Sequence, residues 1–146
     1  MRCLFSLCVD KAGLRALRRW DVAVFVLCIG LHVAVHVFRD RVSQPQLAYL
    51  LRCHANDFLG GAAFLAYMNL VLSWYRTGPR RVRRYRTVFA VACLCSLCWE
   101  GIAPLIKTST ADWWDCLAYL LGATAYWLAD RRVVRRLLRT SAQEKT

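Results

Sequence analysis

Four long apolar stretches dominate the sequence and constrain its fold more than any other feature. They run over residues 22–38, 58–75, 87–106 and 111–129, and each is 17 to 20 residues long. A helix needs about 20 apolar residues to cross the hydrocarbon of a bilayer, with a range of about 17–25. A strand of a membrane barrel needs about half that length and alternates polar with apolar residues. The stretches therefore predict an all-α polytopic membrane protein, a bundle of four transmembrane helices.

The 21 lysines and arginines are unevenly distributed among the segments that flank these spans. Seventeen lie before the first span, between the second and third, or after the fourth, and four lie in the two other loops. This bias predicts that both termini are cytoplasmic. The chain then divides into a basic N-terminal segment (1–19), a membrane domain (20–130) and a basic cytoplasmic tail (131–146). The N-terminal segment fits either an amphipathic surface helix or a loose segment.

A net charge of +12 raises the question of a nucleic-acid partner. Because the basic residues are confined to one side of a membrane protein, anionic headgroups of the inner leaflet are the simpler partner, and we predict no nucleic-acid binding. The arginines expected to contact these headgroups lie between the second and third spans and after the fourth: Arg80, Arg81, Arg83, Arg84, Arg131, Arg132, Arg135 and Arg136.

Ionisable side chains at membrane depth gather in the outer third of the predicted bundle. Glu100 lies about 8 Å short of the outer end of the third span. Asp112 and Asp115 open the fourth span, and His54 and Asp57 come just before the second. Such groups are costly in a membrane and usually face the bundle interior or a wet cavity. We therefore expect an acidic vestibule that opens to the outside.

Helical spacing places several of these groups on common faces. Asp112, Asp115, Tyr119 and Gly122 are separated by three or four residues, so they share one stripe of the fourth helix. The run "GGAA" at residues 60–63 is small enough to let a neighbouring backbone approach. Bundle packing alone explains the glycines and alanines, whereas it does not explain the acids.

The end of the third span and the start of the fourth resemble the VanZ-like family of small bacterial membrane proteins, associated with teicoplanin resistance. The resemblance rests on Glu100, the polar loop "KTSTAD" and the pattern D-x-x-D-x-x-x-Y-x-x-G from Asp112 to Gly122. The chain departs from the family where Ser109 or Thr110 replaces a loop arginine and Tyr119 replaces an asparagine. The resemblance implies a four-span protein of the bacterial cytoplasmic membrane with a role in the cell envelope or in glycopeptide resistance.

The leading hypothesis is a non-enzymatic protein that recognises an envelope lipid or an amphiphilic glycopeptide in the outer vestibule. Carboxylates would accept hydrogen bonds from hydroxyl or amine groups of the ligand, and a tyrosine would donate one. The candidate ligand-binding residues are Glu100, Asp112, Asp115, Tyr119, Asp57 and His54.

A lipid-headgroup hydrolase or transferase is the second hypothesis. His32 and His36 have the spacing by which two helical histidines hold zinc. The glutamate that follows the first histidine of zinc proteases is absent, since Val33 stands there, and no G-x-S-x-G motif occurs. No cofactor is therefore predicted, although a divalent metal at the two histidines is left as an alternative.

Two further alternatives remain open. Carboxylates and histidines can relay protons, so a small proton-coupled transporter, with a homo-oligomer completing the path, is one of them. In the other, the acids pair with Arg39, Arg41, Arg52 or Lys107 and only fix helix packing. Among the eight cysteines, Cys53 and Cys116 are expected near the outer face, where a disulfide between them is conceivable.

Overall fold

The computed structural model describes residues 11–74, 80–106 and 113–143, and it describes their side chains except at 40, 52, 99–106, 138 and 140–143. Every regular element in these ranges is helical, which confirms the all-α prediction. The elements are α1 (Lys11–Phe38), the 3₁₀ turn η1 (Arg39–Arg41), α2 (Pro45–Cys53), α3 (Ala55–Ser73), α4 (Tyr85–Ile106) and α5 (Trp113–Gln143).

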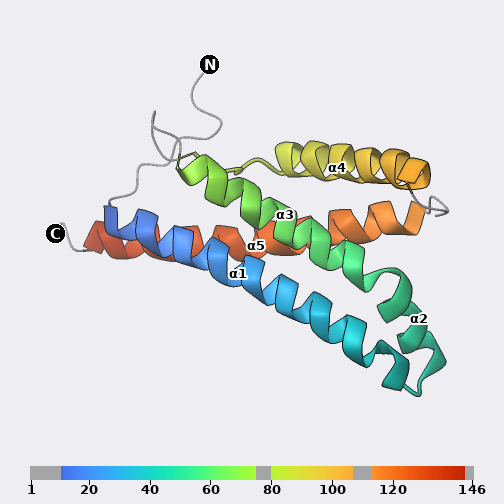
Figure 1. Cartoon of the computed structure of the whole chain (residues 1–146). Helices are drawn as coiled ribbons and strands as arrows, with labels where there is room; N and C mark the ends of the chain where they lie inside the picture. The colour runs from blue at the N-terminus through green and yellow to red at the C-terminus, as the bar shows by residue number, and fades with distance from the viewer. Residues whose placement is uncertain (1–10, 75–79, 107–112, 144–146) are drawn as a thin grey trace.

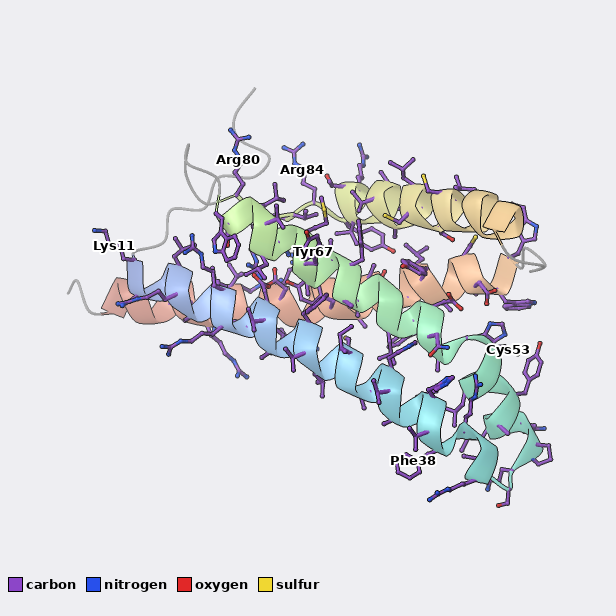
Figure 2. All side chains as sticks on the ribbon, in the orientation of Figure 1. Lys11, Phe38, Cys53, Tyr67, Arg80 and Arg84 are labelled. Carbon is purple, nitrogen blue, oxygen red and sulfur yellow. The ribbon has the colours of Figure 1, made fainter. Side chains whose placement is uncertain are left out.

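The four long helices run in alternating directions, as Figure 1 shows. One end of the molecule holds the start of α1, the end of α3, the start of α4 and the end of α5, and we call it the basic end. Lys11, Arg80 and Arg84 lie there in Figure 2. The opposite end carries α2, with Phe38 and Cys53 nearby, and we call it the α2 end. Alternation therefore brings three basic segments that are distant in sequence to the same end.

Helix α3 lies at the centre of the packing. It contacts α1 on one side and α5 on the other, and α5 in turn contacts α4. Few contacts join α3 to α4 or α1 to α5. The helices therefore pack in the spatial order α1, α3, α5, α4, which the sequence does not specify.

Glycines allow α3 and α5 to pack with their backbones in contact. A Cβ atom added at Gly122 would overlap the carbonyl oxygen of Phe58, and one added at Gly61 would overlap that of Tyr119. Small residues at a helix interface permit this close approach. The predicted approach of a neighbouring backbone at residues 60–63 is thus confirmed.

The bundle buries a group of polar side chains and exposes many large apolar ones. Asp21 is 0% exposed and Asn69 1% exposed, whereas Val26 on α1 is 61% exposed and Leu94 on α4 is 63% exposed. Soluble proteins rarely show large contiguous apolar surfaces, whereas a bilayer accepts them. Among the described residues, one helix, α1, is long and apolar enough to span a membrane by length and composition, and the part Tyr85–Cys98 of α4 is a shorter apolar stretch.

Two helices continue beyond the predicted spans at the basic end. Helix α1 begins at Lys11, and α5 runs on to Gln143, so most of the expected basic tail is helical. Leu17 of α1 and Val134 of α5 are buried together there, with Leu137 packed against them. This small apolar cluster holds the two extensions together.

A short helix separates α1 from α3 at the α2 end. Pro45 begins it, a favourable place because the first helical position needs no amide hydrogen. His54 ends α2 and precedes α3, with φ −119° and ψ −16°. The change of direction at His54 puts its side chain and the first turn of α3 near the start of α5.

Candidate functional site

A cavity of about 620 Å³ lies among α1, α2, α3 and α5 toward the α2 end. Its lining residues are Cys28, Ile29, His32, Cys53, Asn56, Asp57, Leu59, Gly60, Ala63 and Tyr119. This size is within the range of about 300–1,000 Å³ that is typical of small-molecule sites. It is the candidate site at this end of the bundle.

The lining changes from polar to apolar along the helices. Residues near the α2 end contribute an imidazole, an amide and a carboxylate, from His32, Asn56 and Asp57. One or two turns further toward the middle of the bundle, the wall consists of small or apolar groups such as Ile29 and Ala63. The cavity therefore has a polar part near the α2 end, which we call its mouth, and an apolar part toward the middle of the bundle, which we call its floor.

Two of the predicted ligand-binding residues line this cavity together. Asp57 approaches from α3 and Tyr119 from α5. The ring of Tyr119 lies against Gly60, whose added Cβ would be 3.1 Å from the tyrosine hydroxyl oxygen. Gly60 therefore makes room for this ring. The oxygen Oδ1 of Asn56, on the same wall, is buried and has no hydrogen-bond partner.

Two other predicted residues meet at the start of α5. His54 Nδ1 lies 2.9 Å from Asp115 Oδ1, and both side chains are partly exposed. This contact ties the α2–α3 junction to α5. Glu100 lies in α4 with its side chain outside the described part, and Asp112 lies outside the described residues.

The two candidate metal ligands of α1 differ in their surroundings. Both are exposed, but His32 lines the cavity, whereas His36, one turn further on, is not among its lining residues. Within the described residues, no group of three or more histidine, cysteine, aspartate or glutamate side chains is placed to hold a metal ion. Cys53 and Cys116 are free thiols.

A buried polar cluster lies toward the basic end, and the sequence analysis did not anticipate it. Arg81, in the connection between α3 and α4, points inward between Asp21 of α1 and Asp130 of α5. Arg81 Nη1 and Nη2 donate to the two oxygens of Asp21 at 2.8 and 2.7 Å, and Arg81 Nε donates to both oxygens of Asp130 at 3.0 Å. Arg81 Nη2 also bonds to Asp130 Oδ1.

Neutral groups complete this cluster. The hydroxyl of Tyr126 donates to Asp21 and accepts hydrogen bonds from Asn69 Nδ2 at 3.1 Å and from Arg81 Nη2 at 3.2 Å. The side-chain oxygen of Asn69 accepts from the backbone N–H of Val82 at 2.8 Å. The network therefore joins α1, α3, α5 and the connection before α4.

The position of Arg81 corrects its assignment as a lipid contact. Its side chain is 3% exposed, so it is not available to a membrane surface. Burial alone would lower the pKa of Arg81, but the hydrogen bonds with Asp130 and Asp21 outweigh it and hold this pKa above its ordinary value. The other seven arginines assigned to lipid are exposed, as the lipid assignment requires: Arg80, Arg83, Arg84, Arg131, Arg132, Arg135 and Arg136.

One signal in the sequence does point to the buried cluster. Asp21 and Asp130 flank the first and fourth spans on the side where nearly all other charges are basic. Two isolated carboxylates at the same predicted depth indicate a shared cationic partner. Six arginines lie between the second and third apolar stretches. A run such as "RRVRR" does not indicate which of them turns inward.

Comparisons with known proteins return no relative for this chain. No protein-family model, no curated protein and no solved structure matches it.

Proposed function

We propose that the chain is a four-span protein of the bacterial cytoplasmic membrane that binds the polar head of an amphiphile in the cavity near the α2 end, which faces outward. The cavity with its polar mouth and apolar floor carries this proposal. An amphiphile has a matching arrangement, a polar head group followed by an apolar chain. The resemblance to VanZ-like proteins and a role in the cell envelope belong to the same proposal.

The distribution of side chains supports a membrane setting. Exposed apolar side chains lie on all four long helices, and the polar side chains of the buried cluster around Arg81 are hydrogen-bonded to one another. Inside a bilayer each polar group needs an internal partner, because hydrocarbon offers none. The gathering of basic residues at one end supports cytoplasmic termini.

The groups at the cavity mouth favour a ligand that donates hydrogen bonds. The carboxylate of Asp57 accepts hydrogen bonds only, and Asn56 Oδ1 is an acceptor without a partner. A buried acceptor that lacks a donor costs about 1–3 kcal/mol. A head group with an ammonium or hydroxyl group therefore complements this wall better than one without a donor.

Titration with two lysophospholipids tests the site directly. Lysophosphatidylethanolamine carries a donor ammonium, and lysophosphatidylcholine of the same chain length carries a quaternary one without N–H donors. We expect native mass spectrometry of the detergent-extracted protein to show tighter binding of the ethanolamine lipid. Asp57→Asn should remove that preference, and Ala63→Phe, which fills the floor, should weaken both lipids.

The matched control for filling the floor is Ala90→Phe on the exposed face of α4. Equal binding by wild type, Ala63→Phe and Ala90→Phe would show that the cavity is not the site. Equal affinity of the wild type for both lipids would overturn the preference for a donor head group.

Labelling with a membrane-impermeant maleimide in intact cells tests the topology. A variant that retains Cys53 as its single cysteine should be labelled from outside, because Cys53 is exposed at the α2 end. A cysteine-free variant carrying Arg84→Cys should be labelled only after the membrane is opened. The opposite result would invert the proposed orientation.

A further inference from the structure

We propose that Arg131, whose guanidinium lies over the indole of Trp127, and Arg83, whose backbone carbonyl accepts a hydrogen bond from that indole, form a binding site for the phosphate of an anionic phospholipid in the cytoplasmic leaflet. The site lies at the basic end, on the surface formed by α5 and the start of α4. It rests on the proposed orientation in the membrane, and it is independent of the cavity near the α2 end.

Trp127 organises the two arginines in different ways. The guanidinium carbon of Arg131, one turn further along α5, lies 4.6 Å from the centre of a Trp127 ring. On the edge of the indole, Trp127 Nε1 donates to the carbonyl oxygen of Arg83 at 3.0 Å. Tyr85 packs against the same indole with ring centres 5.1 Å apart. The loop and the helix are thus held together at this point.

Stacking prepares Arg131 for an anion. A guanidinium that lies over an aromatic ring uses its face for that contact, so its N–H groups remain directed outward in its plane. That fork matches the oxygens of a phosphate, which accepts two parallel hydrogen bonds from it. Both Arg131 and Arg83 are exposed, so an anion can reach them.

The acidic side chains that the structure describes at the basic end are not paired with Arg83 or Arg131. Of the described residues at the basic end, Asp21 and Asp130 are the acidic ones, and both are buried against Arg81. Within the described residues, these two carboxylates are engaged by Arg81 and do not balance the charges of Arg83 and Arg131.

The neighbouring surface favours a lipid as the source of the phosphate. Phe89, one turn along α4 from Tyr85, is 48% exposed, and Leu128, beside Trp127 on α5, is 49% exposed. Tryptophan and tyrosine at the end of an apolar span are typical of the membrane interface. A phosphate bound at Arg131 would therefore have apolar helix surface beside it for acyl chains.

Native mass spectrometry of the full chain in detergent, titrated with phosphatidylglycerol, tests this site. Loss of one charge-assisted hydrogen-bonding group should weaken binding about tenfold in Arg131→Gln. Trp127→Leu keeps both charges but removes the indole, and we expect a similar loss. The matched control is Arg139→Gln, the same change at an exposed position two helical turns away, which should weaken binding by less than about twofold because salt screens it.

Each outcome decides the proposal. Equal losses in Arg131→Gln and Arg139→Gln would overturn it in favour of a diffuse positive surface, and this comparison stands even if Trp127→Leu fails to fold. Displacement of the lipid by millimolar inorganic phosphate would overturn the lipid as the ligand and leave an anion site. Ala63→Phe should bind phosphatidylglycerol like the wild type, so failure of the cavity proposal is seen separately with the lysophospholipids.

Discussion

Arg81 donates hydrogen bonds to both oxygens of Asp21, at 2.7 and 2.8 Å, across 60 residues of sequence. The pair is buried, with 3% of the arginine side chain and none of the aspartate side chain exposed. It anchors the connection between α3 and α4 to α1. Four predictions about stability follow from this arrangement and from the packing around it.

Removing the guanidinium should be strongly destabilising. In Arg81→Met, two buried carboxylates lose their cationic partner, and the loss of one member of a buried ion pair costs about 3–5 kcal/mol. We expect the free energy of unfolding, measured in detergent by chemical denaturation, to fall by this amount. Arg84→Met, an exposed arginine of the same connection, is the control and should change it by less than about 0.5 kcal/mol. Similar effects of the two substitutions would contradict the inward position of Arg81.

Neutralising one carboxylate should cost less than removing the guanidinium. One arginine faces two aspartates, so Asp21→Asn leaves Arg81 paired with Asp130 and costs about 1–3 kcal/mol for the altered hydrogen bonds. Asp115→Asn serves as the comparison, because its pair with His54 is partly exposed and is worth about 0–1 kcal/mol. A larger loss of unfolding free energy in Asp115→Asn than in Asp21→Asn would refute this assignment.

The hydroxyl of Tyr126 should contribute to stability through the cluster. Tyr126→Phe removes the donor to Asp21 and the acceptor of Asn69, which leaves buried polar groups unsatisfied at about 1–3 kcal/mol. Tyr67→Phe makes the same change on a side chain that is 49% exposed, and it should have an effect below about 0.5 kcal/mol. Equal midpoints of thermal unfolding for the two variants would exclude this role.

Backbone contact between α3 and α5 should make Gly122 intolerant of any side chain. Gly122→Ala places a methyl group into the carbonyl of Phe58, so the helices must separate, and we expect a loss of about 1–3 kcal/mol. Gly30→Ala on α1 has nothing within 4 Å of the added carbon. Because alanine favours a helix over glycine by about 1 kcal/mol, Gly30→Ala should stabilise or leave stability unchanged. The signs of the two shifts in unfolding temperature check this contrast.

Local patterns were enough to predict the helices. Each of the four predicted spans lies mostly within a long helix, because the length and apolar character of a helical segment are properties of consecutive residues. The short helix at Pro45–Cys53 and the extensions at both ends of the chain were not predicted as helices in this form. They lie outside the apolar stretches, where helical structure depends on packing such as that of Leu17 against Val134.

The candidate site was only partly predictable. Membrane depth placed Asp57 in the expected outer vestibule, helical spacing placed Tyr119 on the stripe that faces it, and the structure places both at one cavity. Depth did not distinguish them from Asp115, which pairs with His54 instead. Depth is a coordinate along the helix axis, whereas contact also requires the helices to be neighbours and to face each other.

The sequence by itself determined that the chain is helical, that its apolar surface is large and that its basic segments meet at one end, because these follow from residue order and from the alternating direction of successive helices. Only the tertiary structure decided that α3 lies between α1 and α5, and that Arg81 rather than its neighbours turns inward. The reason is that arginines in one run are locally equivalent. Asp21 and Asp130, brought together by helix packing from opposite ends of the chain, select the one that they can reach.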